Sequence, residues 1–405
     1  MPDVPEVYSR PAEPEPPKLV RPKGALAGPI KVALLLPLSG ADAALGQALL
    51  DAAQMALFDV GDDRLMILPR DTAGTPEGAV AAVEAVLSEG AELILGPLFA
   101  ASVRAVAPLA RAGNVPIVAF STDRSVAGGG VFLMGFTPDQ QVERVVAYAA
   151  RQGLTRFAAL APATPYGTAV VDALNRAAAL HGGDVVQVER YDPEVGDVSE
   201  TVRRLADYER RRAALERQRG LLAARGDDVS KTALRRLERL DTIGDLGFDA
   251  VMLPEGGNRL RAVAPLLPFY DIDTGKVRLL GTGLWDEPGL GAEPALVGGW
   301  FASTPPDSAA AFQERFRAFY GRTPPRISSL AYDAVALAAA LAGDPPETRF
   351  GTDAITAPSG FAGFDGIFRF ASDGVAERGL AVIEIEPTGL RVIDPAPQSF
   401  ESLIN

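Results

Sequence analysis

Small hydroxyl-bearing and acidic side chains stand directly after several short apolar runs of the sequence. Ser39 follows one such run, Ser102 lies just beyond another, and Ser121, Thr122 and Asp123 follow a third. Hydroxyl and backbone N–H groups can hold a carboxylate or another polar group by hydrogen bonds without a permanent charge. The same residue types also cap helices, so for Ser102 and Ser121 capping and ligand binding remain equally open interpretations.

Larger side chains end other apolar runs in the same way. Tyr166 offers a flat aromatic wall, Glu255 adds a carboxylate and Trp285 adds a second ring. The loop 96–102 contributes two small residues next to its serine. Ligands of open α/β sheets bind beyond the carboxyl ends of the strands, so we expect these positions to surround one ligand. The candidate ligand-binding residues are Ser39, Ala100, Ala101, Ser102, Ser121, Thr122, Asp123, Tyr166, Glu255 and Trp285.

Groups for covalent or acid–base catalysis are scarce. The sequence has no cysteine, and its one histidine, His181, stands in a helix-to-strand turn where we interpret it as a surface residue. It contains no G-x-S-x-G nucleophile motif, no phosphate-binding P-loop and no H-E-x-x-H zinc motif. Gly281 and Gly283 form a G-x-G, but Asp286 replaces the third glycine of a dinucleotide fingerprint. We therefore expect no enzymatic activity, no cofactor and no metal.

The apolar runs alternate with segments of helical periodicity, which predicts strands joined by helices. Parallel strands need such crossovers, and the same alternation restarts after Pro138. We predict an α/β fold of two Rossmann-like lobes joined by several crossover strands. Strands are expected at 32–36, 65–68, 91–95, 115–120, 156–160, 184–191, 250–253 and 277–281.

Late helices at 308–320 and 328–341 follow the second unit and predict a return to the first lobe. Strands at 364–370 and 379–385 flank a Ser-Asp-Gly turn and predict a β-hairpin. The opening segment is rich in Pro and Glu, which is typical of an extended, disordered chain. The expected divisions are a tether at 1–29, a first lobe at 30–138 plus about 300–355, and a second lobe at 139–299 plus about 356–405.

A charge-dense insertion at 200–244 interrupts the second lobe. Helices are expected at 209–225 and 230–240 around a Gly226 turn, and the segment is basic although the chain has a net charge of -13. One interpretation is a docking arm for another protein. The other is a solvated helical hairpin with ion pairs along its helices, which we favour because charge runs usually form such faces.

The overall composition limits the partners. An excess of acidic residues opposes binding to phosphates, so we expect no nucleic-acid partner. Apolar residues make up 47% of the chain, but no run approaches the roughly 18 uninterrupted apolar residues of a membrane span. Met1 is followed by Pro2 and Asp3 rather than by a basic start and an apolar run, so no export signal is visible here.

Several motifs together resemble one known family. These are KVALLLPLSG at 31–40, ILGPL at 94–98, PIVAFST at 116–122 and the pair Tyr166 and Gly167. In this order they resemble the type 1 periplasmic binding fold, in particular the Leu/Ile/Val-binding family of solute receptors, over about residues 30–390. The resemblance implies a periplasmic, non-enzymatic receptor that closes on a small polar ligand. The implied ligand contacts are Ala100, Ser121, Asp123 or its neighbour Thr122, and Tyr166.

The sequence departs from that family at two positions. Ala100 stands where amino-acid receptors use a serine to bind the ligand carboxylate, and no carboxylate aligns near Gly283, where an acid would meet the ligand ammonium. Losing both partners of a zwitterion would cost several kcal/mol if the charges were buried unpaired. A free amino acid is therefore not the expected ligand.

Within the family, the LLLPLSG opening, the long N-terminal segment and the helical insertion resemble the penicillin-binding protein activators. These are outer-membrane lipoproteins that stimulate peptidoglycan synthases. On this branch a lipid-bearing export segment would precede Met1, and the insertion would contact a peptidoglycan synthase. The alternative is the substrate-binding subunit of an ABC importer, which would deliver an amino acid or a related small polar solute to a permease.

Overall fold

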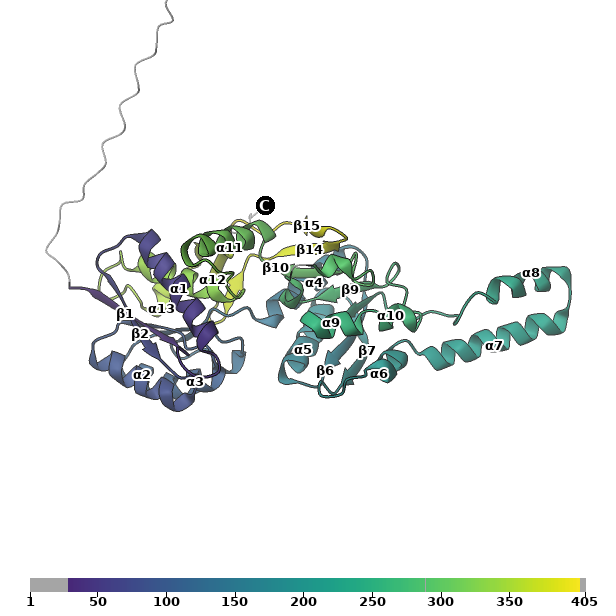
Figure 1. Ribbon diagram of the computed structural model, residues 1–405, viewed down its shortest axis with the longest axis horizontal. Helices are drawn as coiled ribbons and strands as arrows, with labels where there is room; N and C mark the ends of the chain where they lie inside the picture. Colours follow the sequence, from purple (N-terminus) through teal and green to yellow (C-terminus); the bar gives the residue numbers. More distant parts are fainter. Residues whose placement is uncertain (1–27, 288, 401–405) are drawn as a thin grey trace, which may run out of the picture.

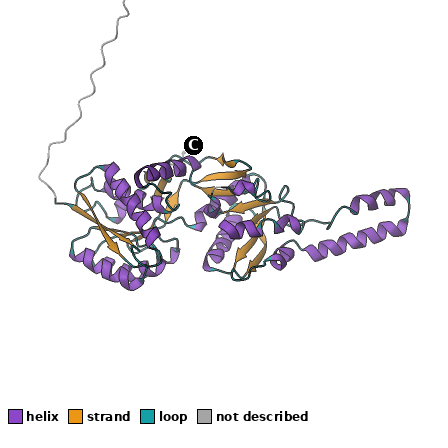
Figure 2. Cartoon of the chain, in the orientation of Figure 1, coloured by secondary structure: helices purple, strands orange, loops and turns teal. Residues whose placement is uncertain are grey.

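The computed structural model describes residues 28–287 and 289–400, which form two α/β lobes and a projecting helical arm (Figure 1). Both lobes contain a parallel sheet with helices on its two faces (Figure 2). This arrangement confirms the predicted fold class. The tether predicted at 1–29 lies outside the described residues, except for Gly28 and Pro29.

In the described part of the chain, the sheet of the first lobe has five parallel strands in the order β2-β1-β3-β4-β5. Its central strand β1 is almost completely buried, because helices cover both faces of the sheet, and its sequence is therefore a continuous apolar run. One face packs against α1 (Ala43–Val60) and α12 (Ser328–Leu341), and the other against α2 (Pro76–Ser88) and α3 (Ala100–Ala112). The strands are β1 (Ile30–Leu36), β2 (Leu65–Asp71), β3 (Leu93–Leu95), β4 (Ile117–Ala119) and β5 (Val131–Leu133).

The sheet of the second lobe has seven strands among the residues that the structure describes, in the order β15-β14-β10-β9-β8-β6-β7. Strands β6 to β10 are parallel, whereas β14 pairs antiparallel with both β10 and β15. The strands are β6 (Arg156–Pro162), β7 (Asp184–Tyr191), β8 (Ala250–Met252), β9 (Arg278–Gly281), β10 (Trp300–Ser303), β14 (Ala381–Glu386) and β15 (Gly389–Asp394). The helices around them are α4 (Pro138–Arg151), α5 (Pro165–Leu180), α6 (Ser199–Leu205), α9 (Gly257–Val263) and α10 (Leu266–Phe269).

Within the described residues the chain passes between the lobes three times, through short segments at 134–137, 304–305 and 379–380. These crossovers differ from the boundaries expected at about 300 and 355. Strand β10 pairs with β9, so the first return begins only after it. A small sheet of β11 (Phe361–Gly363), β12 (Gly366–Phe370) and β13 (Ala376–Arg378) packs on the core of the first lobe, together with α11 (Pro306–Tyr320) and α13 (Thr352–Ile355).

The predicted hairpin at 364–385 is only half correct. Strands β12 and β13 do pair antiparallel around the expected turn. Strand β14, however, leaves for the other lobe and pairs with β10, because Gly379 and Leu380 form the third crossover. Local turn signals identify the first partner of a strand but contain no information about which sheet the next strand joins.

The insertion forms the projecting arm, which we define as α7 (Tyr208–Arg225), the turn at Gly226, and α8 (Asp228–Leu237) (Figure 1). Only Arg211, Leu215 and Ser230 are buried within these two helices. The expected pair of charged helices is thus present, and it projects from the second lobe instead of packing on it.

Candidate functional site

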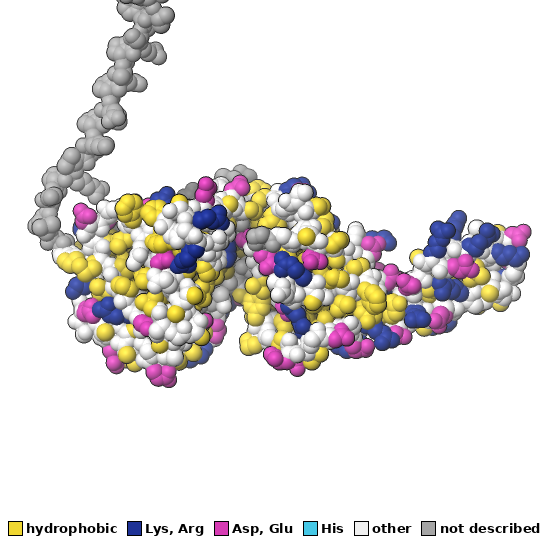
Figure 3. All heavy atoms as spheres, in the orientation of Figure 1, with side chains coloured by type: hydrophobic (Ala, Val, Ile, Leu, Met, Phe, Trp, Pro, Cys, Tyr) yellow, Lys and Arg dark blue, Asp and Glu magenta, His cyan; other side chains and the backbone are white. Residues whose placement is uncertain are grey.

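A pocket of about 660 Å³ opens between the two lobes. Its walls come from the loops after β3 and β4 in the first lobe and after β9 in the second, so the carboxyl ends of both sheets contribute to one cavity. The space-filling view shows the molecule notched between the lobes (Figure 3). Nine of the 21 residues that line the pocket are large apolar side chains: Leu45, Leu98, Phe99, Phe120, Phe136, Leu284, Ile327, Leu330 and Leu380.

Five of the ten predicted site residues line this pocket, namely Ala100, Ser121, Thr122, Asp123 and Tyr166. The buried Ser121 hydroxyl accepts a hydrogen bond from the backbone N–H of Asp123 at 3.1 Å, which fixes the turn after β4. Thr122 is exposed toward solvent between them. The loop after β4 thus places three polar side chains side by side at the pocket wall.

Tyr166 is positioned by the cap of helix α5. The hydroxyl of Thr164 accepts a hydrogen bond from the backbone N–H of Gly167 at 3.0 Å, and Pro165 occupies the first helical position. A side chain at Gly167 would overlap the carbonyl of Pro162, so glycine is required there. The Tyr166 ring therefore starts in the first turn of α5 and faces the pocket.

The Tyr166 hydroxyl is held by a partner within the second lobe. It lies 2.8 Å from the hydroxyl of Thr282, which is itself fully buried at the end of β9. Burial raises the pKa of Tyr166, so the phenol stays protonated and can donate a hydrogen bond.

The other five predicted residues do not line the pocket. Ser39 is exposed and its backbone N–H donates to Asp71 at 3.2 Å, while Ala101 is exposed on α3. Ser102 is buried on the inner side of α3, and its hydroxyl has no hydrogen-bond partner among the described residues. Helical periodicity explains the difference from Ala100, because consecutive residues of a helix point in different directions.

Trp285 and Glu255 stabilise the second lobe beside the pocket. Trp285 is completely buried, and its indole N–H donates to the carbonyl of Glu255 at 3.0 Å. The carboxylate of Glu255 accepts a hydrogen bond from the hydroxyl of Tyr191. Both side chains are thus engaged within their own lobe, which a strand-end position alone does not reveal.

Two acidic side chains line the pocket that strand-end reasoning missed. Asp286 accepts a hydrogen bond from Ser303 at 2.9 Å and pairs with Arg326 at 3.3 Å. Glu287 pairs with Arg261 at 2.9 Å. From the sequence, no carboxylate is expected near Gly283. In the structure, Asp286 and Glu287, three and four residues later, line the same pocket as Gly283, and both pair with arginines.

Arg326 forms the floor of the pocket. Besides Asp286, its guanidinium pairs with the buried Asp365 at 2.9 Å and donates to Ser329 at 3.0 Å and to Thr304. The two carboxylates come from different lobes, so Arg326 connects them across the cleft. The nearby carboxylates raise its pKa despite burial, and it remains a cation. A single basic residue before an Ala-rich helix was the only sequence signal for this role.

The ring of Phe136, on the first crossover, contacts two arginines, Arg326 and Arg378. The guanidinium of Arg326 is 4.9 Å from its centroid and that of Arg378 is 4.7 Å away. Arg378 is buried on β13 and donates to the carbonyl of Met134 at 2.7 Å. The crossovers are therefore stabilised by two stacked arginines next to the ligand pocket.

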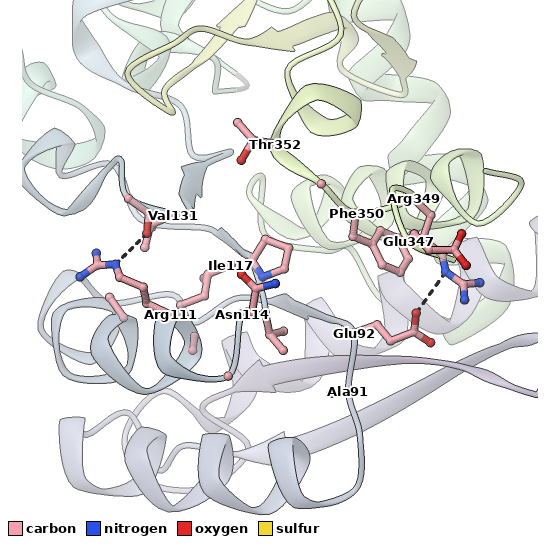
Figure 4. Close-up of a pocket in the computed structure, with 18 of the residues that line it drawn as sticks. Ala91, Glu92, Arg111, Asn114, Ile117, Val131, Glu347, Arg349, Phe350 and Thr352 are labelled. Atoms are coloured by element: carbon pink, nitrogen blue, oxygen red, sulfur yellow. Dashed lines mark hydrogen bonds and ion pairs between the residues drawn. The ribbon is translucent and has the colours of Figure 1, made fainter. Parts of the chain in front are cut away.

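A second hollow of similar volume lies at the opposite, amino-terminal edge of the first sheet (Figure 4). Figure 4 shows Arg349 reaching toward Glu92, with which it pairs at 3.1 Å, while Arg111 donates to the carbonyl of Gly129 at 3.1 Å. Asn114 points into the space between them. Arg111 and Arg349 are thus engaged by the backbone and by Glu92, and the lining of this hollow comes from the first lobe alone.

Within residues 28–287 and 289–400, no helix is long and apolar enough to cross a membrane. The same residues contain no group of three or more His, Asp or Glu side chains placed to hold a metal ion.

Comparisons with known proteins agree with this geometry. A family model described as periplasmic binding protein matches residues 29–209. A Leu/Ile/Val-binding protein homolog of Brucella abortus is 28% identical over 192 residues, covering 45% of this chain and 49% of that protein. The chain spans about half the length of the curated relatives that it matches.

Solved structures cover nearly the whole chain. A putative branched-chain amino acid ABC transporter protein of Rhodospirillum rubrum has a TM-score of 0.71 at 20% identity, covering 90% of this chain and all of that one. A solute binding protein of R. palustris, in complex with benzoate, has a TM-score of 0.60 at 18% identity, covering 93% and 98%. At these identities the likenesses show the fold that the proteins share, and the activator branch receives no support from them.

Proposed function

We propose that this chain, which has the type 1 periplasmic binding fold, is a solute-binding subunit of an ABC importer, of the Leu/Ile/Val-binding type. It would act in the periplasm without catalysis, closing its lobes on a ligand and delivering it to a permease. The observation that supports this most directly is the pocket between the carboxyl ends of the two sheets. Closure would bury both walls at once and strengthen their hydrogen bonds.

The pocket favours a ligand with a carboxylate. Helix α3 begins beside it at Ala100 and has no side-chain cap, so its first backbone N–H groups are available to an anion. The hydroxyl groups of Ser121 and Thr122 lie on the same wall. Loss of the serine at position 100 therefore still leaves backbone and hydroxyl donors for one carboxylate.

The pocket does not favour an ammonium group on the same ligand. Asp286 and Glu287, the acids on the second-lobe wall, are paired with arginines. The remaining acid of the described lining, Asp123, is exposed at the mouth, accepts a hydrogen bond from the backbone N–H of Ser125 at 2.9 Å and pairs with Arg104 at 3.7 Å. An ammonium would have to displace an existing cation, at a cost of several kcal/mol for a buried pair.

The apolar wall defines the rest of the ligand. Phe99, Phe120 and Phe136 face the cavity together with aliphatic side chains from both lobes. Burying one aromatic or branched side chain contributes about 1.5–3 kcal/mol. We therefore propose an aromatic or branched-chain monocarboxylate as the solute class, in line with the benzoate bound by the R. palustris protein.

Thermal denaturation with a small ligand panel tests this proposal. Benzoate, 4-hydroxybenzoate and isovalerate are compared with leucine and isoleucine, and binding is confirmed by calorimetry. A ligand at a hundred times its dissociation constant should stabilise the native state by about 2.7 kcal/mol. We expect the carboxylates without an ammonium to bind more tightly than the amino acids.

Substitutions locate the response in the cleft. Thr122→Val and Tyr166→Phe each remove one hydroxyl of the pocket and should weaken binding by roughly 5- to 10-fold. Ser39→Ala is the matched control, because Ser39 was a sequence candidate and lies outside the lining. A flat response to the whole panel would contradict the importer proposal, whereas tighter binding of leucine would contradict only the proposed solute class.

A further inference from the structure

Hydrogen bonds fix the two helices of the projecting arm relative to each other, although few residues of these helices are buried. The carboxylate of Asp227 caps α8, accepting hydrogen bonds from the backbone N–H of Ser230 at 2.8 Å and from its hydroxyl at 3.0 Å. The guanidinium of Arg219 donates to the carbonyls of Leu237 at 2.7 Å and Leu240 at 3.0 Å, closing the other end. The two helices are thus held side by side in one orientation.

The arm carries charge of the opposite sign to the rest of the protein. Residues 208–240 contain ten Lys and Arg but five Asp and Glu, although the whole chain has a net charge of -13. Helix α7 has 18 residues and is therefore roughly 27 Å long, about three Debye lengths at physiological ionic strength. The acidic lobes consequently screen little of the positive field at the far end of the arm.

Much of this charge has no partner. Arg217, Arg225, Arg235, Arg236 and Arg239 form no ion pair or side-chain hydrogen bond among the described residues. The side chains on the other side of α8, such as Leu234 and Leu237, turn toward α7 and are partly buried. The outer face of α8 therefore carries Lys231 and Arg235 one helical turn apart, and Arg239 follows in the turn after the helix, so the three form a basic stripe. Figure 3 shows Lys and Arg side chains gathered over this end of the arm.

The chemistry of the stripe favours a lipid surface over a protein or an RNA. The arm contains a single aromatic residue, Tyr208, which packs at its base against Tyr270. It therefore lacks the aromatic anchors of protein interfaces and the stacking platforms of single-stranded nucleic-acid binders. Val229 is 81% exposed and shares a side of α8 with Arg236 by helical spacing, and Leu240, just beyond the helix, is 44% exposed.

We propose that the arm docks this protein onto an anionic phospholipid surface through the outer face of α8. Arginines there would bind headgroup phosphates while Val229 and Leu240 enter the headgroup region. The tip carries Asp227 and Asp228 and would be repelled, so the arm approaches by its side. The arm projects from the second lobe, and only three residues of its two helices are buried, so its outer surface is open to a partner. The inference is independent of the ligand in the cleft.

Vesicle sedimentation tests it with the whole protein. Vesicles of phosphatidylcholine with 30% phosphatidylglycerol are compared with pure phosphatidylcholine at low and high salt. Each basic residue near an anionic surface contributes roughly fivefold in partitioning, so the double variant Arg235→Glu with Arg239→Glu should bind at least roughly 30-fold more weakly. Binding should also be lost in pure phosphatidylcholine and at high salt.

A matched variant carries the same change of net charge elsewhere. Arg151→Glu with Arg176→Glu alters two exposed arginines of the second lobe, and each carboxylate they leave keeps another arginine. This control should bind vesicles within about threefold of the unaltered protein. Equal melting temperatures verify that both variants fold.

Three results would overturn the proposal. The first is no binding of the unaltered protein to anionic vesicles, and the second is equal loss of binding in both double variants. The third is binding to poly-L-glutamate without binding to vesicles, which would identify the stripe as a site for an acidic protein instead.

Discussion

Asp333 is a buried acid beside the crossovers, and its titration should be visible in the stability of the whole protein. The residue is completely buried on α12. Its carboxylate accepts hydrogen bonds from the backbone N–H groups of Phe364 at 2.7 Å and Asp365 at 3.4 Å. Burial and the charge of Asp365 raise the pKa of Asp333 to about 7, although Arg378 opposes this. We consider the substitution Asp333→Asn, which mimics the protonated side chain.

The direction of the pH effect follows from the bound protons. Below about pH 4, Asp333 is protonated in both the folded and the unfolded protein. Between about pH 4 and 7 the unfolded chain loses this proton while the folded protein keeps it, so the free energy of unfolding falls as the pH rises. A pKa difference of about three units corresponds to about 4 kcal/mol, which is lost by about pH 7.

Urea denaturation at pH 4.5 and pH 8 measures this contribution. The unfolding free energy of the Asp333→Asn variant, relative to the unaltered protein, should increase by up to about 4 kcal/mol between the two pH values. Asp344→Asn, at an exposed acid, is the control and should change by less than about 0.5 kcal/mol. A pH-independent difference for Asp333→Asn, or one of the opposite sign, would refute the assigned protonation of the buried acid.

Two further substitutions probe the pocket floor and the arm. Arg326→Met leaves the carboxylates of Asp286 and Asp365 without their shared cation. In urea denaturation it should lower the free energy of unfolding by about 3–5 kcal/mol. An effect below about 1 kcal/mol would contradict the proposed link between the lobes. Asp227→Ala removes the cap of α8 and should cost about 1 kcal/mol of local stability, seen as faster amide exchange in α8 with the exchange of β1 unchanged; equal acceleration in both would contradict an independent arm.

The sheets were predictable because their physics is local. The apolar run of β1 is continuous because helices cover both faces of its sheet. The start of α5 was predictable because its capping threonine and its first proline are adjacent in the sequence. Parallel pairing then follows from the helical crossovers. What remained hidden was the destination of β14, whose membership of the second sheet depends on contacts with β10 far away in the sequence.

The site was predictable only where it follows strand ends. Ser121 and Thr122 extend directly from β4, so their place in the lining follows from sheet topology. Trp285 satisfies the same rule but turns inward, because β9 continues into a short helical turn that packs its ring on the core. Arg326 does not follow the end of a strand, and its position depends on two carboxylates that come from different lobes.

The three crossovers between the lobes contribute residues to the pocket. Phe136, Thr304 and Leu380 each belong to a different crossover, and all three line the pocket. A ligand there touches the segments whose dihedral angles must change when the lobes rotate. It can shift the equilibrium only by the difference between its contacts in the open and closed forms. Contacts with crossover residues differ most between those forms, so altering Phe136 should change the extent of closure as well as affinity, whereas altering Thr122 should change affinity alone.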